Sequence, residues 1–505
     1  MTTGGTSTDA PDRTLLEHVR PPDWVNPTPA SRYHLVVLGA GTAGLVAAAG
    51  AAGLGARVAL VERERLGGDC LNVGCVPSKA LLRAARAAAD VRDAGDFGIR
   101  VPEGTRVDFT AVMARMRELR AALAPNDSAA RFRALGVDVF LGEGRFTSRD
   151  TLTVAGATLR FGRAVIATGA RPVIPPVAGL AEACPLTNES VFDLTAMPPR
   201  LAIVGAGPIG CELAQAFARF GAAVVLLDHG PRVLGREDDE AAACVARALA
   251  RDGVRLALGA TLTRVERRPG GEAVLHVEIG GRAESLVVDA ILVGAGRTPS
   301  VQGLGLEAAG VAFDARRGVH VDDRLRTANR RIFAAGDVCS AYRFTHAADF
   351  QARVVVQNAL FPGRARASAL TVPRCTYTDP EVAHVGLSER EARARGIAVR
   401  TFVQPLAEVD RAVLDGETEG FVKVHVRAGT DRLVGATVVA RHAGEMLPEL
   451  TLALVEGIGL GRLARVIHTY PTQADAIRKL GDAYQRTRLT PRVRALLGAW
   501  LAWFR

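Results

Sequence analysis

Two cysteines and a lysine close together form the part of this sequence best suited to redox chemistry. Cys70 and Cys75 lie in a glycine-containing stretch, residues 67–79, and Lys79 follows Cys75 by one helical turn. The stretch runs into an expected helix, whose positive N-terminal end favours a thiolate at Cys75. Lysine is rare, with three residues against 60 arginines, so its presence here indicates a task that a guanidinium cannot perform. We expect a redox-active disulfide; two buried thiols are the structural alternative.

A dinucleotide-binding pattern lies upstream of this cysteine pair. An apolar run, residues 35–38, leads into Gly39-Ala-Gly-Thr-Ala-Gly44, an alanine-rich helical segment, and a second apolar run that ends at Glu62. The glycines allow a tight turn and let a pyrophosphate approach the helix N-terminus, and the acid can bind a ribose hydroxyl. Because strand, helix and acid all stand at the required spacing, the pattern predicts a βαβ dinucleotide site.

The same pattern recurs further along the chain. The apolar run 201–204 precedes Gly205-Ala-Gly-Pro-Ile-Gly210, and a later run, residues 224–227, ends at Asp228; in both copies the terminal acid follows the first glycine by 23 residues. Two dinucleotide sites with a cysteine pair after the first imply a bound flavin dinucleotide and an exchangeable nicotinamide. Electrons would pass from nicotinamide to flavin to disulfide.

Residues 33–490 resemble the two-dinucleotide-fold flavin disulfide reductases, a family that includes lipoamide dehydrogenase, glutathione reductase and mercuric reductase. Four further segments carry this resemblance: the crossings between domains at 167–172 and 293–299, a second flavin motif at 332–337, and the entry to a dimerisation domain at 374–381.

The resemblance implies roles for individual residues. Cys70 is the outer interchange thiol, Cys75 the flavin-side thiol, and Lys79 and Glu212 the ion pair beside the flavin. The implied FAD-binding residues are Gly39, Gly41, Thr42, Ala43, Gly44, Glu62, Gly68, Asp69, Thr168, Gly169 and Asp337. The implied NAD(P)-binding residues are Gly205, Gly207, Ile209, Gly210, Asp228 and Gly296.

The predicted fold class is α/β, with two Rossmann-like dinucleotide-binding domains, for FAD and NAD(P), plus a C-terminal α+β dimerisation domain. The expected boundaries are 1–31 for a flexible N-terminal arm with Trp24 as its anchor, 32–185 and 300–362 for the FAD-binding domain, 186–299 for the NAD(P)-binding domain, 363–487 for the dimerisation domain and 488–505 for a basic amphipathic tail. A homodimer with shared active sites is expected.

The C-terminal signature departs from that of the disulfide reductases, which carry His-Pro-Thr-x-x-Glu and use the histidine as acid and base. Tyr470 stands at the histidine position and Asp475 at the glutamate position, and both are taken as catalytic candidates. His468, on an extended segment, would share a face with Tyr470 and could replace the base, although a structural histidine is the favoured interpretation. Because a phenol has a pKa near 10, it is a poor base at neutral pH.

Tyrosine before Pro-Thr resembles the mercuric reductases instead, which favours Hg(II) or a related soft electrophile as the acceptor. The C-terminal cysteine pair of those enzymes is missing, because Cys375 is the last cysteine of the sequence. The alternatives are a disulfide reductase similar to dihydrolipoamide dehydrogenase or glutathione reductase, an NAD(P)H:quinone dehydrogenase, and a non-enzymatic flavin redox sensor.

The nicotinamide preference depends on residues at the second strand end. Asp228 favours a free 2′-hydroxyl and therefore NADH, whereas Arg232 and Arg236, with His229, could recruit a 2′-phosphate and favour NADPH.

A net charge of +10 invites a nucleic-acid interpretation, which the sequence does not favour. The arginines are spread over expected helix faces, as at Arg115, Arg117, Arg120, Arg131 and Arg133, and are interpreted as a solvated surface. The N-terminal residues show no signal-peptide pattern, so a cytoplasmic location is expected.

The tail combines arginines with an apolar stripe. Arg488, Arg492 and Arg505 accompany Leu489, Val493, Leu496, Trp500 and Phe504 at helical spacing. Two interpretations follow: peripheral contact with an anionic membrane, or packing against the dimerisation domain.

Overall fold

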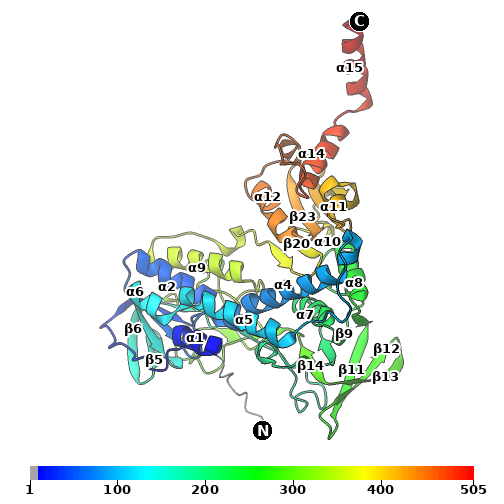
Figure 1. The fold of residues 1–505 in the computed structure, drawn as a ribbon. Helices are drawn as coiled ribbons and strands as arrows, with labels where there is room; N and C mark the ends of the chain where they lie inside the picture. Colours follow the sequence, from blue (N-terminus) through cyan, green and yellow to red (C-terminus); the bar gives the residue numbers. More distant parts are fainter. Residues whose placement is uncertain (1–9, 505) are drawn as a thin grey trace. The chain divides into compact units, whose positions relative to one another are not determined.

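The computed structural model describes residues 10–504, which divide into two compact units. The first contains residues 1–229 and 253–370, and the second contains residues 230–252 and 371–505. Figure 1 shows the elements of each unit along the chain. The mixed α/β class predicted from the sequence is confirmed.

The first unit contains a seven-stranded sheet with the strand order β3-β2-β1-β6-β5-β4, with β18 also pairing to β6. Its strands are β1 (Tyr33–Leu38), β2 (Val58–Glu62), β3 (Val137–Leu141), β4 (Gly144–Ser148), β5 (Thr151–Val154), β6 (Ala157–Ile166) and β18 (Ile332–Ala334). Its helices are α1 (Ala10–Val19), α2 (Thr42–Gly53), α3 (Gly68–Asn72), α4 (Cys75–Arg92), α5 (Phe109–Leu123), α6 (Ala129–Ala134) and α9 (Thr345–Leu360). β1 pairs in parallel with both β2 and β6, and its apolar residues are buried, as expected for a parallel strand covered on both faces.

The same unit contains a four-stranded parallel sheet in the order β10-β9-β8-β14. This sheet comprises β8 (Arg200–Val204), β9 (Ala223–Asp228), β10 (Arg255–Leu258) and β14 (Ala290–Val293), with α7 (Pro208–Arg219) after β8 and the antiparallel strands β11 (Ala260–Arg267), β12 (Ala273–Ile279) and β13 (Arg282–Val288). The two expected crossings pair with each other as β7 (Ala170–Pro172) and β15 (Arg297–Pro299), and β16 (Phe313–Asp314) pairs with β17 (Gly318–Val319).

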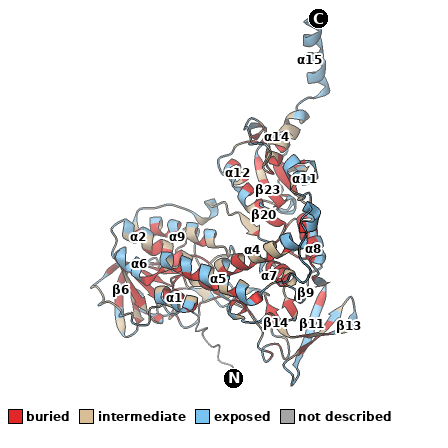
Figure 2. Cartoon of the chain, in the orientation of Figure 1, coloured by how far each residue is buried: buried red, intermediate tan, exposed pale blue. Residues whose placement is uncertain are grey.

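The second unit is built on a five-stranded antiparallel sheet in the order β19-β20-β23-β22-β21. The strands are β19 (Arg374–Thr376), β20 (Glu381–Gly386), β21 (Val399–Pro405), β22 (Phe421–Arg427) and β23 (Leu433–Ala440). The helices are α8 (Asp239–Arg251), α10 (Glu389–Ala394), α11 (Asp410–Leu414), α12 (Ala443–Val455), α13 (Leu460–Leu463), α14 (Asp475–Thr487) and α15 (Pro491–Trp503). Figure 2 shows the buried faces of the sheets and helices in each unit.

The segment 230–252 differs from the expected domain boundaries, because it groups with the C-terminal unit. Lys423 on β22 is 6% exposed, and its Nζ contacts the carboxylates of Asp238, at 3.0 Å, and Glu240, at 2.6 Å. A buried ammonium needs such partners, so these ion pairs hold the segment in its place. The other boundaries remain predictions.

The expected disorder of the N-terminal arm is wrong for residues 10–31; residues 1–9 lie outside the described part. Leu15 and Val19 on α1 are buried, Trp24 Nε1 donates to the Val139 carbonyl at 3.1 Å, and Asn26 exchanges two hydrogen bonds with the backbone of Leu141. The i, i+4 spacing of the two apolar residues was the sequence signal for this helix, but the polar composition around it concealed that signal.

The interpretation of the arginines as a solvated surface is also wrong for two of them. Arg117 and Arg120 on α5 are 4% and 2% exposed, respectively. Asp12 on α1 forms an ion pair with each, which compensates charges that could not otherwise be buried.

The expected helix of the tail is confirmed as α15, but its packing on the dimerisation domain is wrong, because none of its residues is buried. Figure 1 shows α15 as the red helix that follows α14. At about 100° per residue, its large apolar side chains fall on one arc, with Arg492 and Arg494 at the two edges and alanines and a glycine opposite. Arg505 lies outside the described residues.

Peripheral membrane contact through α15 therefore stays a prediction. We expect the full chain to bind vesicles containing phosphatidylglycerol and a chain truncated before Thr490 to lose that binding. Arg492 and Arg494 should each contribute about 1 kcal/mol near an anionic surface. The control is the Trp500→Ala/Trp503→Ala variant, which keeps the arginines and should bind weakly. Equal flotation of the full and truncated chains would remove this prediction.

Candidate active site

The redox loop, residues 66–75, lies directly against the first glycine turn. A Cβ added to Gly68 would stand 2.6 Å from the Cα of Gly41, which is closer than real Cβ contacts, so the two backbones can meet only because residue 68 is glycine. α3 contains Cys70, and α4 begins at Cys75 itself. The cysteine pair is thereby fixed to the turn that the sequence assigned to the flavin pyrophosphate.

Three neighbours stabilise the thiolate form of Cys75. Cys70 hydrogen-bonds to it, the Thr345 hydroxyl lies 3.4 Å from its sulfur, and the Lys79 ammonium attracts its negative charge. Burial and the Glu212 carboxylate have the opposite effect, but the three favourable contacts outweigh them and lower the pKa of Cys75 to about 6. The same hydrogen bond, together with burial, raises the pKa of Cys70. Both residues are thiols in this structure. The pair is thus polarised, with the negative charge on the sulfur of Cys75.

Lys79 and Glu212 form the ion pair that the resemblance implied. Lys79 Nζ lies 2.9 Å from Glu212 Oε2, joining α4 to α7, and the Glu212 side chain is 5% exposed. A carboxylate this deep in the protein requires a cation, and Lys79 supplies it one helical turn from Cys75.

The residues assigned to FAD meet at one edge of the first sheet. The parallel strands β1, β6 and β18 end at Leu38, Ile166 and Ala334, so the segments that follow them emerge side by side. These segments carry Gly39, Gly41, Thr42, Ala43, Gly44, Thr168, Gly169 and Asp337. The carboxyl edge of a parallel sheet is where α/β proteins bind nucleotides.

The geometry of this edge fits a flavin dinucleotide. A Cβ on Gly44 would lie 1.8 Å from the Gly39 carbonyl oxygen, so helix α2 starts as close to the turn as glycine permits. Glu62, at the end of β2, accepts a hydrogen bond from the Ala40 N–H at 2.7 Å, which fixes its carboxylate beside the turn. Burial raises the pKa of Glu62 and that of Asp337. Arg297 lies 3.7 Å from Asp337 and also pairs with Asp69.

The residues assigned to NAD(P) repeat this arrangement on the second sheet. A Cβ on Gly210 would lie 1.8 Å from the Gly205 carbonyl oxygen, and Asp228 accepts from the Ala206 N–H at 2.6 Å. Gly207 caps α7, which contains Ile209, and Gly296 follows β14. The fit supports a second dinucleotide at this edge, with Asp228 beside its turn.

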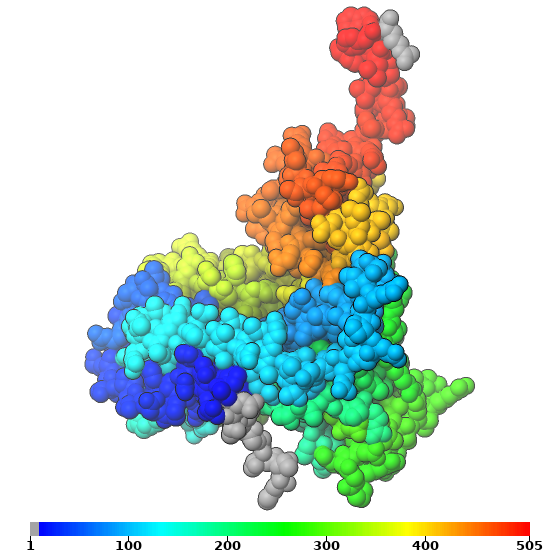
Figure 3. Space-filling model, in the orientation of Figure 1, coloured from blue at the N-terminus to red at the C-terminus, as the bar shows by residue number. Residues whose placement is uncertain are grey.

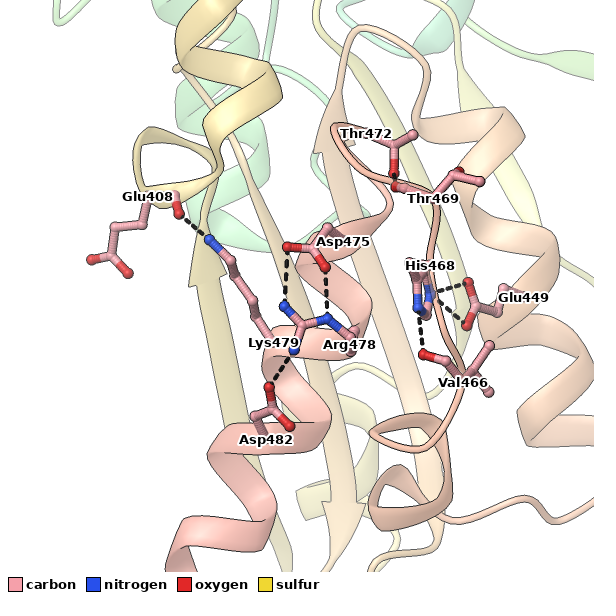
Figure 4. A network of polar contacts seen from close by, with 10 residues as sticks. All are labelled: Glu408, Glu449, Val466, His468, Thr469, Thr472, Asp475, Arg478, Lys479 and Asp482. Carbon is pink, nitrogen blue, oxygen red and sulfur yellow. Dashed lines mark hydrogen bonds and ion pairs between the residues drawn. The ribbon is translucent and has the colours of Figure 1, made fainter.

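Tyr470 and Asp475 form hydrogen bonds with different partners. Tyr470 is 73% exposed, and its hydroxyl donates to Asp410 at 2.8 Å; this bond raises the pKa of the phenol. Asp475 instead forms an ion pair with Arg478, at 2.7 Å, in the first turn of α14 (Figure 4). Asp475 thus engages Arg478 and not the phenol, and the catalytic roles of Tyr470 and Asp475 remain predictions.

His468 is the structural histidine that the sequence favoured. Its Nε2 lies 3.1 Å from both carboxylate oxygens of Glu449 and its Nδ1 lies 3.1 Å from the Val466 carbonyl oxygen (Figure 4). The expectation that it shares a face with Tyr470 is wrong, because its side chain is only 6% exposed. The segment is not a strand, so alternate residues need not point the same way.

Two residues near the thiols were missed as individual site residues. Thr345 contacts Cys75 from the first turn of α9, 270 positions along the chain. Arg297 lies within the expected crossing between domains at 293–299, but its ion pairs with Asp69 and Asp337 were not predicted. Neither contact left a signal in local spacing, since both depend on tertiary packing.

Two family models cover most of the chain. The model for pyridine nucleotide-disulphide oxidoreductases matches residues 33–352, and that for the dimerisation domain of the same family matches residues 372–480.

The chain belongs to the pyridine nucleotide-disulphide oxidoreductase family. Members of this family depend on FAD and NAD(P), and the dimerisation domain supports a homodimer.

Relatives of this oxidoreductase carry different names. A mercuric reductase from Bacillus cereus is 34% identical over 446 residues, covering 88% of this chain and 70% of the relative. A dihydrolipoyl dehydrogenase from Thermus scotoductus is 35% identical over 463 residues, covering 90% and 98%. The HOCl-induced flavoprotein disulfide reductase RclA from Escherichia coli has a TM-score of 0.80 at 29% identity, covering 89% of this chain and 99% of that one. Residues 10–504 contain no helix that is long and apolar enough to cross a membrane.

The lowered pKa of Cys75 predicts a pH profile. In the two-electron-reduced enzyme, the thiolate-to-flavin charge-transfer absorption should persist at pH 7 and disappear as the pH falls through about 6, because only the thiolate gives the band. Lys79→Gln should move this midpoint upward, by roughly one unit, or about 1.4 kcal/mol. Glu212→Gln should move it downward, because Glu212 opposes the thiolate. Anaerobic spectrophotometric titration measures the midpoint of the unmodified enzyme and of the two variants, with Cys75→Ser as the control that lacks the band. A midpoint near the ordinary pKa of a thiol in the unmodified enzyme would contradict the lowered pKa of Cys75.

Proposed function

We propose that this oxidoreductase passes two electrons from NAD(P)H, through FAD and the Cys70–Cys75 pair, to Hg(II) or a related soft electrophile. FAD, when bound, supplies the relay of electron pairs between nicotinamide and cysteines. Over one cycle NAD(P)H loses two electrons and releases one proton, Hg(II) gains the two electrons to become Hg(0), and the cysteine pair returns to its starting state.

The state of Tyr470 is the observation that carries this proposal. Its phenol is exposed and bonded to Asp410, which keeps it protonated at neutral pH. His468 has both nitrogens engaged, and Asp475 is paired with Arg478. We therefore assign none of the three the protonation of a thiol leaving group, which disulfide exchange requires. A soft metal ion held by thiolates needs no such proton, and a neutral phenol can steady it while its ligands exchange.

The names of similar proteins support a metal acceptor. Several relatives are called mercuric reductases, and a Cu(II) complex of RclA is among the solved structures similar to this chain. Since Cys375 is the last cysteine, this chain lacks the C-terminal pair expected of a full mercuric reductase. We therefore expect slower turnover and inhibition by excess metal.

A disulfide reductase is the second candidate. Relatives named dihydrolipoyl dehydrogenase cover this chain as completely as the mercuric reductases do. A panel of Hg(II), Cu(II), glutathione disulfide, lipoamide and a quinone, each given to the NADH-reduced enzyme, distinguishes these acceptors. Brisk turnover of a disulfide with no response to Hg(II) would replace the metal assignment, and turnover of the quinone by Cys70→Ser would indicate a general dehydrogenase. A flavin sensor would turn over none of them.

Replacing Tyr470 tests the proposed acceptor chemistry. Tyr470→Phe should lower Hg(II)-stimulated NADH oxidation about tenfold, or about 1.4 kcal/mol, because one oxygen donor is lost. Flavin reduction by nicotinamide, followed by stopped flow, should be unchanged. Tyr484→Phe makes the same chemical change on α14, where the ring packs on Phe402, and should leave turnover intact. Tyr470→His should raise disulfide reductase activity. Unaltered Hg(II) turnover in Tyr470→Phe would exclude a role for the phenol.

The nicotinamide site should prefer NADH. Asp228 lies beside the turn and would repel a 2′-phosphate, while Arg232 already pairs with Asp239 and donates to the Gly235 carbonyl at 3.0 Å. Asp228→Ser should therefore reduce the ratio of kcat/KM for NADH over NADPH, with Glu278→Gln, on strand β12, as a control for a lost surface carboxylate. A kcat/KM for NADPH exceeding that for NADH by tenfold, about 1.4 kcal/mol, would reverse the preference.

A further inference from the structure

The N-terminal helix α1 lies outside both residue ranges matched by the family models, yet it is packed into the first unit. The match begins at residue 33, whereas α1 spans Ala10–Val19. Leu15 and Val19 are 1% and 0% exposed, and α1 contacts α5 and α6. Figure 3 shows the dark-blue N-terminal residues lying against the cyan ones that include α5.

A polar residue of α1 is buried with the apolar ones. Asp12 is 8% exposed, and its Oδ1 lies 2.7 Å from Nη2 of Arg120, whose side chain is 2% exposed. The second oxygen lies 3.8 Å from Nε of Arg117. Since an uncompensated guanidinium is very unfavourable at this depth, Asp12 is what allows Arg120 to occupy its position.

Arg120 connects this ion pair to the redox loop. Its Nη1 donates to the Asn72 carbonyl at 2.8 Å, and Asn72 lies between the two cysteines. The Asn72 amide in turn donates to the carbonyls of Leu66, at 3.0 Å, and Gly68, at 2.8 Å. The backbone N–H of Leu66 donates to Val19 at the end of α1, at 3.0 Å. Helix α1 therefore contacts the redox loop directly at Leu66, where the loop starts, and through Arg120 at Asn72, near the middle of the loop.

We propose that α1 is a positioning element for the redox loop, in which Asp12, acting through Arg120, fixes the Asn72 carbonyl and so holds Cys70 against Cys75. Asp12 and Arg120 are positioning residues, since neither touches a sulfur. Disulfide exchange demands this control, because the two Cα atoms must stay within about 4.4–6.8 Å for the bond to form. The inference rests on the proposed redox role of the pair.

The experiment uses the full FAD-loaded chain with three substitutions in the network and two controls. Asp12→Asn removes the carboxylate charge, Asp12→Glu keeps it, and Arg120→Lys keeps the cation but loses the fork that reaches two partners at once. Leu15→Ala weakens the packing of α1 without touching the polar network. Glu17→Gln removes an exposed charge from the same helix.

Three measurements separate positioning from stability. They are the intensity of the charge-transfer band after two-electron reduction, the rate of iodoacetamide labelling of Cys70 in the reduced protein, and the thermal midpoint. Asp12→Asn and Arg120→Lys should weaken the band and speed Cys70 labelling about tenfold, because moving Cys70 breaks the hydrogen bond that favours the Cys75 thiolate and keeps Cys70 protonated, and only a thiolate reacts with iodoacetamide. Asp12→Glu should retain most of the band. Leu15→Ala should lower the midpoint while leaving band and labelling within about twofold, and Glu17→Gln should change none of the three.

Two results would overturn the inference. One is an unchanged band and labelling rate in both Asp12→Asn and Arg120→Lys. The other is an equal redox defect in Leu15→Ala at a matched thermal midpoint, which would make α1 a stabilising element only. If Asp12→Asn fails to fold, Arg120→Lys decides, since it keeps the buried charges balanced. Absence of the band in the unmodified enzyme would refute the proposed function instead, and Cys70 labelling would still test the positioning role.

Discussion

The contact between two glycines, Gly41 and Gly68, is the constraint on which the site depends. The turn after β1 and the redox loop before α4 meet there with no space for a Cβ on Gly68. A side chain at position 68 would push the redox loop, with its cysteines, away from the dinucleotide edge of the sheet, and electrons could then no longer pass by contact between a dinucleotide at that edge and the cysteines.

The charge on Cys75 follows from that placement. At the start of α4, the sulfur lies at the positive end of an 18-residue helix, and Thr345 approaches from the start of α9. Lys79 adds a full charge one turn away, and Glu212 moderates it. The lysine therefore serves two anions: it permits the burial of Glu212, and it favours the thiolate. A stronger cation without the carboxylate would stabilise the thiolate further, but would also make it a poorer nucleophile.

Much of this site could be predicted from the sequence because its determinants are local. The glycine turns, the strand-ending acids Glu62 and Asp228 and the cysteine spacing each specify a geometry within some 25 residues, and the two strands with their helix follow from apolar patterns. The burial of Arg120 could not be predicted, because it depends on Asp12, 108 positions away. His468 was misplaced for a related reason: alternation applies only to a strand, and its partner Glu449 lies on another element.

The C-terminal residues place a histidine and a carboxylate in contact, but not at the positions that the resemblance implied. A histidine and a glutamate are both present, as His468 and Glu449, but they bond to each other with a carbonyl occupying the remaining nitrogen. Such a histidine has no nitrogen left to exchange a proton with a thiol. Tyr470 is exposed, and its phenol donates to Asp410. Under the proposed function, this neutral oxygen would contact a metal acceptor that binds through sulfur and oxygen and requires no proton, whereas a disulfide acceptor, whose leaving thiolate needs one, would require a different proton donor.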